Sequence, residues 1–178
     1  MSPLRPDLVD VWIFRPTAGE TAADVGTGPA SPAPIEFLLL RRAKGDAILP
    51  GLWQGVSGGL EPRESSVDAA VRELAEETGF GPDQIDRFYH LDQVNQFLDP
   101  SSGAILSAIV FAVRVKPGAE PALSHEHDAM RWLTPDEARE LAVWPAYCES
   151  IRRILEILLD PERASWFELT LDGERARR

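Results

Sequence analysis

The chain has 178 residues, 44% of them hydrophobic, and a formal net charge of -11. This length predicts one globular domain over residues 1–178, and the acidic charge argues against long nucleic acid or an anionic membrane as a partner. The single cysteine excludes an internal disulfide and a cysteine-rich zinc module, and no segment resembles a signal peptide or a membrane span, so we expect a cytoplasmic protein.

The first half of the chain predicts strands followed by one helix. Segments Leu8–Phe14 and Ile35–Arg42 are rich in β-branched and aromatic residues, which favours strands. Residues 16–34 between them are mostly Gly, Pro, Ala, Ser and Thr, so we expect a flexible loop insertion. A short strand at residues 52–58 precedes a helix that begins after Ser65 or Ser66 and ends at Gly79, which suits a left-handed C-terminal turn.

The second half predicts more strands and then helices. Long β-like runs cover residues 85–98 and 104–115, and a shorter one covers 129–133. Thr134–Glu137 has capping-box spacing, and residues 146–159 form an amphipathic pattern whose Ile154, Leu155 and Leu158 are predicted core. The tail after residue 163 suggests an added edge strand. Strands interrupted by one central helix indicate an α/β fold, with a mixed sheet sandwiched by helices.

The helix that ends at Gly79 carries three glutamates within about one turn, Glu73, Glu76 and Glu77. Like charges three or four residues apart destabilise a helix. A solvated acidic face, with Arg72 paired to Glu76, would be the ordinary explanation for such a helix. The longer pattern favours a different explanation.

Gly58 is followed after five residues by Glu64 and after seven more by "RELAEETGF", residues 72–80. This spacing matches every fixed position of the Nudix box, G-x5-E-x7-R-E-U-x-E-E-x-G-U, where U is a bulky apolar residue. The chain therefore resembles the Nudix hydrolases, and the similarity extends to the lead-in "FLLLRRAKGDAILPGLWQGVSGGLE". The resemblance implies an α/β/α sandwich with a mixed β-sheet.

The resemblance also implies Mg²⁺-dependent hydrolysis of a diphosphate linkage, with Mn²⁺ as an alternative metal. Mg²⁺ prefers oxygen ligands and commonly joins carboxylates to substrate phosphates. The implied metal ligands are Glu73, Glu76, Glu77 and a backbone carbonyl at Ser57 or Gly58. Glu73 would also orient or deprotonate the attacking water, and Arg72 with Glu64 would support the catalytic loop.

Further candidates lie outside the motif. Glu126 is the candidate for a distant metal ligand or general base, because it precedes a short strand. Its neighbours His125 and His127 are interpreted mainly as surface or substrate-edge side chains, and less as a zinc site. Arg41 and Arg42 end a strand, and alternation lets only one of them face a substrate phosphate.

Trp53 and Gln54 are placed to contact a base or a pterin, although Trp53 suits the core equally well. The strand "DQVNQF", residues 92–97, supplies further amides that could hydrogen-bond the edge of such a ring. Within the family, "LWQGVSGGLEPRES" and "EHDAMRWL" look most like the branch of dihydroneopterin triphosphate pyrophosphatase and dATP pyrophosphohydrolase. We therefore expect a small nucleotide or pterin triphosphate as substrate and pyrophosphate as product. Alternatives are hydrolysis of ADP-ribose or a dinucleoside polyphosphate, and a non-catalytic nucleotide-binding regulator. A homodimer is left open.

Overall fold

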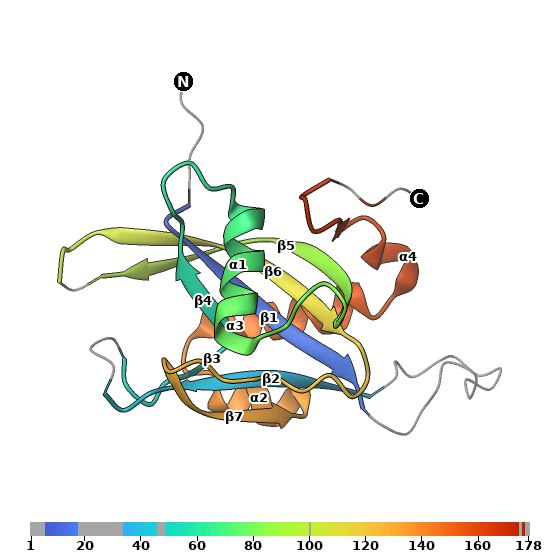
Figure 1. The fold of residues 1–178 in the computed structure, drawn as a ribbon, viewed down its shortest axis with the longest axis horizontal. Coiled ribbons are helices and arrows are strands. Elements are labelled where there is room, and N and C mark those ends of the chain that lie inside the picture. The colour runs from blue at the N-terminus through green and yellow to red at the C-terminus, as the bar shows by residue number, and fades with distance from the viewer. Residues whose placement is uncertain (1–5, 18–33, 46–48, 100, 175, 177–178) are drawn as a thin grey trace.

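The computed structural model describes residues 6–17, 34–45, 49–99, 101–174 and 176. Along the chain the elements are β1 (Leu8–Pro16), β2 (Ile35–Arg42), β3 (Trp53–Gln54), β4 (Val56–Gly59), α1 (Ser66–Thr78), β5 (Ile85–Leu98), β6 (Ile105–Val115), β7 (His127–Leu133), α2 (Pro135–Leu141), α3 (Pro145–Arg153), a π-helical turn (Ile154–Leu158), α4 (Pro161–Ala164) and β8 (Glu168–Leu169). Figure 1 shows their arrangement.

The strands form one mixed sheet. Its order is β3-β2-β1-β6-β5-β8, with β4 also paired to β1 and β7 to β2. β1 and β6 run parallel, whereas β1 is antiparallel to both β2 and β4. The mixed sheet expected from the sequence is therefore confirmed.

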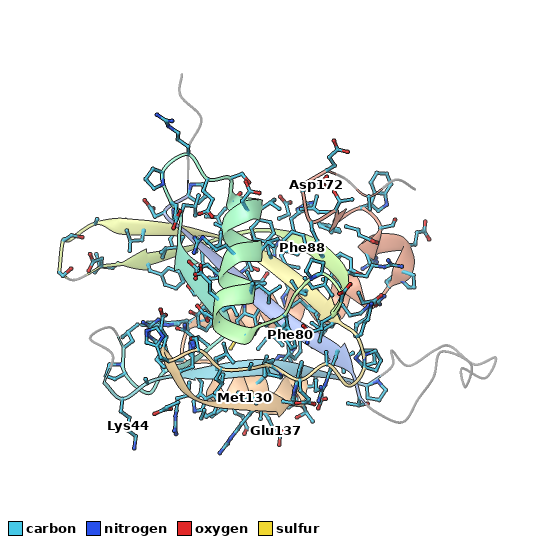
Figure 2. All side chains as sticks on the ribbon, viewed as in Figure 1. Lys44, Phe80, Phe88, Met130, Glu137 and Asp172 are labelled. Atoms are coloured by element: carbon cyan, nitrogen blue, oxygen red, sulfur yellow. The ribbon has the colours of Figure 1, made fainter. Side chains whose placement is uncertain are left out.

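Helices cover both faces of this sheet, α1 on one side and α2 with α3 on the other (Figure 1). Alternating residues of β1 explain this layering, because neighbours along a strand point to opposite faces. Val9, Val11 and Ile13 join a buried cluster with Leu74 of α1, whereas Trp12 and Phe14 join a second cluster with Ile151 of α3. In Figure 2, Phe80 and Phe88 of the first cluster lie beside α1.

Both ends of α1 are fixed by local chemistry. The Ser65 side chain accepts a hydrogen bond from the backbone N–H of Asp68 at 3.1 Å, and so caps the first turn. Gly79 has φ 70° and donates its N–H to the Ala75 carbonyl at 2.9 Å, the left-handed ending expected from the sequence. These caps set the position of the acidic helix relative to β4.

The structure departs from the sequence expectations at three places. The strand expected at residues 52–58 is split into β3 and β4 around Gly55, where a Cβ atom would lie 2.8 Å from the Val11 carbonyl oxygen. The helix expected to reach residue 159 ends its α-helical part at Arg153 and continues as the π-helical turn. In that turn Ile154 and Leu158 are core residues as expected, whereas Leu155 is only partly buried.

The third departure concerns the expected loop at residues 16–34, because Pro16 still belongs to β1. Residues 18–33 lie outside the described residues. The flanking residues are joined, since Thr17 donates its backbone N–H to the Pro34 carbonyl at 2.9 Å.

The edge strand expected in the tail is present as β8, which pairs with β5. None of the helices in the described ranges is long and apolar enough to cross a membrane.

Candidate active site

Arg72 of α1 ties the preceding loop to the helix. Its Nε donates to Glu64 Oε1 at 2.9 Å and its Nη2 donates to Glu64 Oε2 at 3.0 Å, which gives a bidentate ion pair. Nη2 also donates to the Gly59 carbonyl at 2.9 Å. The hydrogen bond with Glu64 is the main cause that raises the pKa of Arg72. The structure thus brings Arg72 and Glu64 together as a brace between β4, the loop and α1.

The carboxylate of Glu73 packs directly against Gly58. A Cβ atom on Gly58 would lie 1.9 Å from Glu73 Cδ and 2.0 Å from its Oε1, so any larger residue would occupy the space of the carboxylate. Arg72 Nη1 donates to Glu73 Oε1 at 2.7 Å. Burial raises the pKa of Glu73, and the contact with Arg72 opposes that effect. Gly58 is therefore needed here because of a close approach between backbone and side chain.

Glu77 lies deeper than its neighbours, with 3% of its surface exposed. Its Oε1 accepts a long hydrogen bond of 3.4 Å from the Ser57 backbone N–H. Burial raises the pKa of Glu77 to about 8, and the negative charges of Glu73 and Glu126 raise it further. Arg42 and the Ser57 N–H act in the opposite direction. An ionised Glu77 thus lacks sufficient positive charge around it.

The interpretation of His127 as a surface residue is wrong. His127 is 5% exposed, and its Nε2 lies 3.6 Å from Glu77 Oε2. The reason is that β7 begins at His127, two residues before the strand expected from the sequence, and pairs it with Arg42 of β2. His125 is exposed.

Two more acidic residues surround this position. Glu76 is largely exposed and accepts a hydrogen bond from Arg72 Nη1 at 3.2 Å. Glu126 lies on the loop before β7, which is anchored to the end of β2 because the Ala43 N–H donates to the Glu126 carbonyl at 2.8 Å. The charge of Glu126 raises the pKa of both Glu73 and Glu77. The structure therefore groups four mutually repelling carboxylates, from α1 and from a loop about fifty residues later.

A hard divalent cation suits this set of groups. Among the residues that the structure describes, no three potential ligand side chains already stand in a metal-binding arrangement, and Glu73 is turned toward Arg72. The carboxylate oxygens are nevertheless the ligands that Mg²⁺ prefers. Glu77 Oε2 is buried without a hydrogen-bond partner, and a cation would relieve the repulsion that raises its pKa.

Arg41 and Arg42 point to different surroundings. Arg41 Nε donates to Asp128 Oδ1 at 2.6 Å, and its guanidinium carbon lies 5.7 Å from the centre of the Trp53 ring. Arg42 is paired with His127 across β2 and β7, and its charge lowers the pKa of Glu77. Of the two arginines, Arg42 is therefore the one that faces the acidic group.

Trp53 and Gln54 lie next to these arginines. Trp53 is half-buried, packs against the cluster on the α3 side and has the guanidinium of Arg131 at 5.2 Å from its ring centre. Gln54 is 3% exposed and lies opposite Leu40 of β2. Trp53 thus combines a core contact with an accessible part, while Gln54 is an interior residue.

A buried polar chain lies on the opposite side of the sheet from α1, and our sequence analysis missed two of its members, Asp10 and Ser150. Asn95 Nδ2 donates to Asp10 Oδ2 at 2.7 Å, and Gln93 Nε2 donates both to Asn95 Oδ1 at 2.7 Å and to Ser150 Oγ at 3.0 Å. A sequence signal was present, because Asp10 interrupts the apolar run "LVDVWIF" of a buried strand.

Residues 31–154 match the family model of the NUDIX domain. The chain belongs to the Nudix hydrolase family. It is 34% identical over 109 residues to the asymmetrical bis(5'-nucleosyl)-tetraphosphatase of Sus scrofa, a match that covers 61% of this chain and 70% of that protein. The Nudix membership and this relative identify a hydrolase that acts on phosphoric anhydride bonds.

A second relative is a much longer protein, and only part of that protein matches this Nudix hydrolase. The chain is 35% identical over 129 residues to an octanoyltransferase of Myxococcus xanthus, which covers 72% of this chain but 33% of that protein. Among solved structures, the dihydroneopterin triphosphate pyrophosphohydrolase of E. coli aligns with a TM-score of 0.65 at 20% identity, covering 85% of this chain and 96% of that one. At that identity the alignment supports the fold alone.

Proposed function

We propose that this Nudix hydrolase uses Mg²⁺ to cleave a diphosphate linkage in a small triphosphate, such as dATP, another nucleoside triphosphate or dihydroneopterin triphosphate, with release of pyrophosphate. The observation that carries the proposal is the packing of the Glu73 carboxylate on Gly58 beside the buried Glu77. Removing two neighbouring carboxylates from water costs free energy, and the packing of the fold does not require it at this point. A fixed acidic site explains why both carboxylates are desolvated here.

The proposed roles combine the family resemblance with the positions of the side chains. Glu73, Glu76, Glu77 and Glu126 would hold the metal, together with a carbonyl at Ser57 or Gly58. The bound ion would neutralise phosphate charge and make a coordinated water more acidic. Glu73 or Glu126 would accept the proton from that water, and the brace of Arg72 and Glu64 would keep Glu73 in place.

Arg42 would contact a substrate phosphate, since it is the arginine on the acidic side of β2. Arg41, Trp53 and Gln54 would contribute more weakly to binding, because Arg41 already pairs with Asp128 and Gln54 is buried. Mn²⁺ also accepts carboxylate oxygens, so it would support the same reaction in place of Mg²⁺.

The test is a phosphate and pyrophosphate release assay over a panel of nucleoside triphosphates and dihydroneopterin triphosphate. The panel is run with Mg²⁺, with Mn²⁺ and with EDTA. We expect turnover with either metal and none with EDTA. Metal-independent turnover, or no turnover on any anhydride substrate, would contradict the proposal.

A dinucleoside polyphosphate is the second candidate substrate, and the similarity to the tetraphosphatase favours it. The same assay includes diadenosine tetraphosphate, whose asymmetric cleavage gives ATP and AMP. A kcat/KM for this compound above that of every triphosphate would replace the first candidate by the second. ADP-ribose, the other alternative expected from the sequence, is included as a further member of the panel.

A further inference from the structure

The buried polar chain of Asp10, Asn95, Gln93 and Ser150 offers hydrogen-bond acceptors and few donors. Asn95 uses its side-chain N–H on Asp10, and Gln93 uses its side-chain N–H groups on Asn95 and Ser150. Two oxygens of the chain have no partner within hydrogen-bonding geometry, Asp10 Oδ1 and Gln93 Oε1. The nearby Ser57 side chain lowers the pKa of Asp10 and is a weak donor to its carboxylate. Asp10 is 2% exposed and Gln93 is 9% exposed. Buried acceptors without partners are unfavourable, and a ligand with N–H donors would satisfy them.

A cavity reaches this chain from the surface. It has a volume of about 380 Å³, and its lining includes Gln93 and Asn95 of β5 and Ala146 of α3. Aromatic side chains stand at the same end of α3, where the Phe97 ring lies 6.3 Å from that of Trp144 and 6.4 Å from that of Tyr147. Phe97 and Trp144 are only partly buried. The rings do not line the cavity itself, but Trp144 is two residues from the lining residue Ala146. A polar cavity next to partly exposed aromatic rings suits a planar heterocycle.

The polar chain is adjacent to the acidic site. Asp10 of β1 lies opposite Ser57 of β4, and the Ser57 N–H donates to Glu77. Tyr147 connects the two regions electrostatically, because burial raises the pKa of its hydroxyl, Asp10 and Glu77 raise it further, and Arg42 lowers it. Ser57 of β4 therefore lies next to both regions, although they are on opposite faces of the sheet, and we infer that the ring of a substrate whose phosphates lie near Arg42 passes this strand toward Asp10.

We propose that Asp10 and Gln93, aligned by Asn95 and Ser150, bind the heterocycle of the substrate and select a ring edge with two adjacent N–H donors, as in guanine or a pterin. Adenine presents one donor beside an acceptor on the corresponding edge, and its ring acceptor would face another acceptor in this pocket. A site built to pair with such donors discriminates strongly against rings that lack them. This inference rests on the proposed hydrolase function and specifies its substrate class.

Asp10→Asn is the decisive variant, because it keeps the shape of the side chain and replaces one acceptor oxygen by a donor. The remaining oxygen can still accept from Asn95. At pH 7.5 we expect kcat/KM for GTP and dihydroneopterin triphosphate to fall about 100-fold, with a change of less than about threefold for ATP. Asp86→Asn, at the exposed carboxylate that pairs with Arg114 at 2.7 Å, is the matched control and should leave the ranking unchanged.

Ring binding is measured separately from hydrolysis. Neopterin, guanosine and adenosine are titrated by calorimetry in EDTA, so that a failure of metal-dependent hydrolysis does not affect the result. We expect neopterin and guanosine to bind wild type at least tenfold more tightly than adenosine, and Asp10→Asn to remove the preference. Gln93→Met removes the second acceptor, which lies nearer the surface, and should weaken the preference for neopterin and guanosine over adenosine. This variant tests the inference even if Asp10→Asn does not fold.

Two outcomes would overturn the inference. In the first, wild type binds adenosine as tightly as guanosine and neopterin. In the second, Asp10→Asn and Gln93→Met lower kcat/KM for all triphosphates by the same factor in step with a lower melting temperature, which would make the polar chain a purely structural element.

Discussion

Gly58→Ala tests the site at its tightest contact. The new Cβ would lie 1.9 Å from Glu73 Cδ, whereas ordinary van der Waals contact begins at 3.4 Å, so the carboxylate must move by about 1.5 Å. The obstructed atoms belong to the end of a flexible side chain, and the Gly58 backbone lies outside the left-handed region, so the fold can accept alanine. A displacement of roughly 1 Å at a catalytic group costs about 100-fold in rate, or about 2.7 kcal/mol.

We therefore expect kcat/KM for the best triphosphate to fall about 100-fold or more, with a change of no more than about 1 kcal/mol in the free energy of unfolding. Gly59→Ala is the matched control, because a Cβ atom at Gly59 meets nothing within 4 Å. The assays are steady-state kinetics with saturating Mg²⁺ and urea denaturation. Full activity in Gly58→Ala would refute the reasoning, as would an equal loss in Gly59→Ala.

Three further predictions concern charged residues. Glu77→Gln removes a desolvated charge, so the metal-free variant should melt at a higher temperature than metal-free wild type at pH 9. Mg²⁺ should raise the melting temperature of wild type but not that of the variant, and an equal rise in both would exclude Glu77 as a ligand. Glu126→Gln should lower kcat far more than it raises KM if the carboxylate acts in the transition state, and a change confined to KM would remove it from the chemistry. Burial raises the pKa of Asp10 from 3.8 to about 6, so the folded state holds this proton more tightly than the unfolded state and stability should decrease as pH rises from about 4 to 6. Wild type should lose about 3 kcal/mol more than Asp10→Asn over that interval, measured by urea denaturation, and parallel pH profiles would contradict the assignment.

Features set by local chemistry could be predicted from the sequence. β2 has the predicted bounds Ile35–Arg42, because its apolar run ends at charged residues. The ends of α1 and the capping box of Thr134 follow from short side-chain hydrogen bonds, which depend on residues three positions apart. The carboxylate-bearing helix was recognisable because its pattern has fixed spacing.

Features that depend on distant segments could not be predicted. The burial of His127 depends on the pairing of β7 with β2, and the split between β3 and β4 depends on the close approach of β1 at Gly55. The orientation of Arg42 toward Glu77 required the β-sheet register, since strand alternation alone leaves Arg41 and Arg42 equivalent. Asp10 was visible as a charge in an apolar strand, but its partners Asn95 and Gln93 lie more than eighty residues away.

The hydrogen bond between Thr17 and Pro34 makes the acidic site independent of the number of residues between β1 and β2. It closes the end of the β1–β2 pair, and Arg42 lies at the other end of β2, about 23 Å away for a strand of this length. Loop-closure entropy grows only slowly with the number of residues enclosed. Insertions and deletions between these two anchors would therefore cost little stability and leave the strand register at the acidic site unchanged. Evolution, or an engineer who inserts a second domain, can use this position without altering the catalytic architecture.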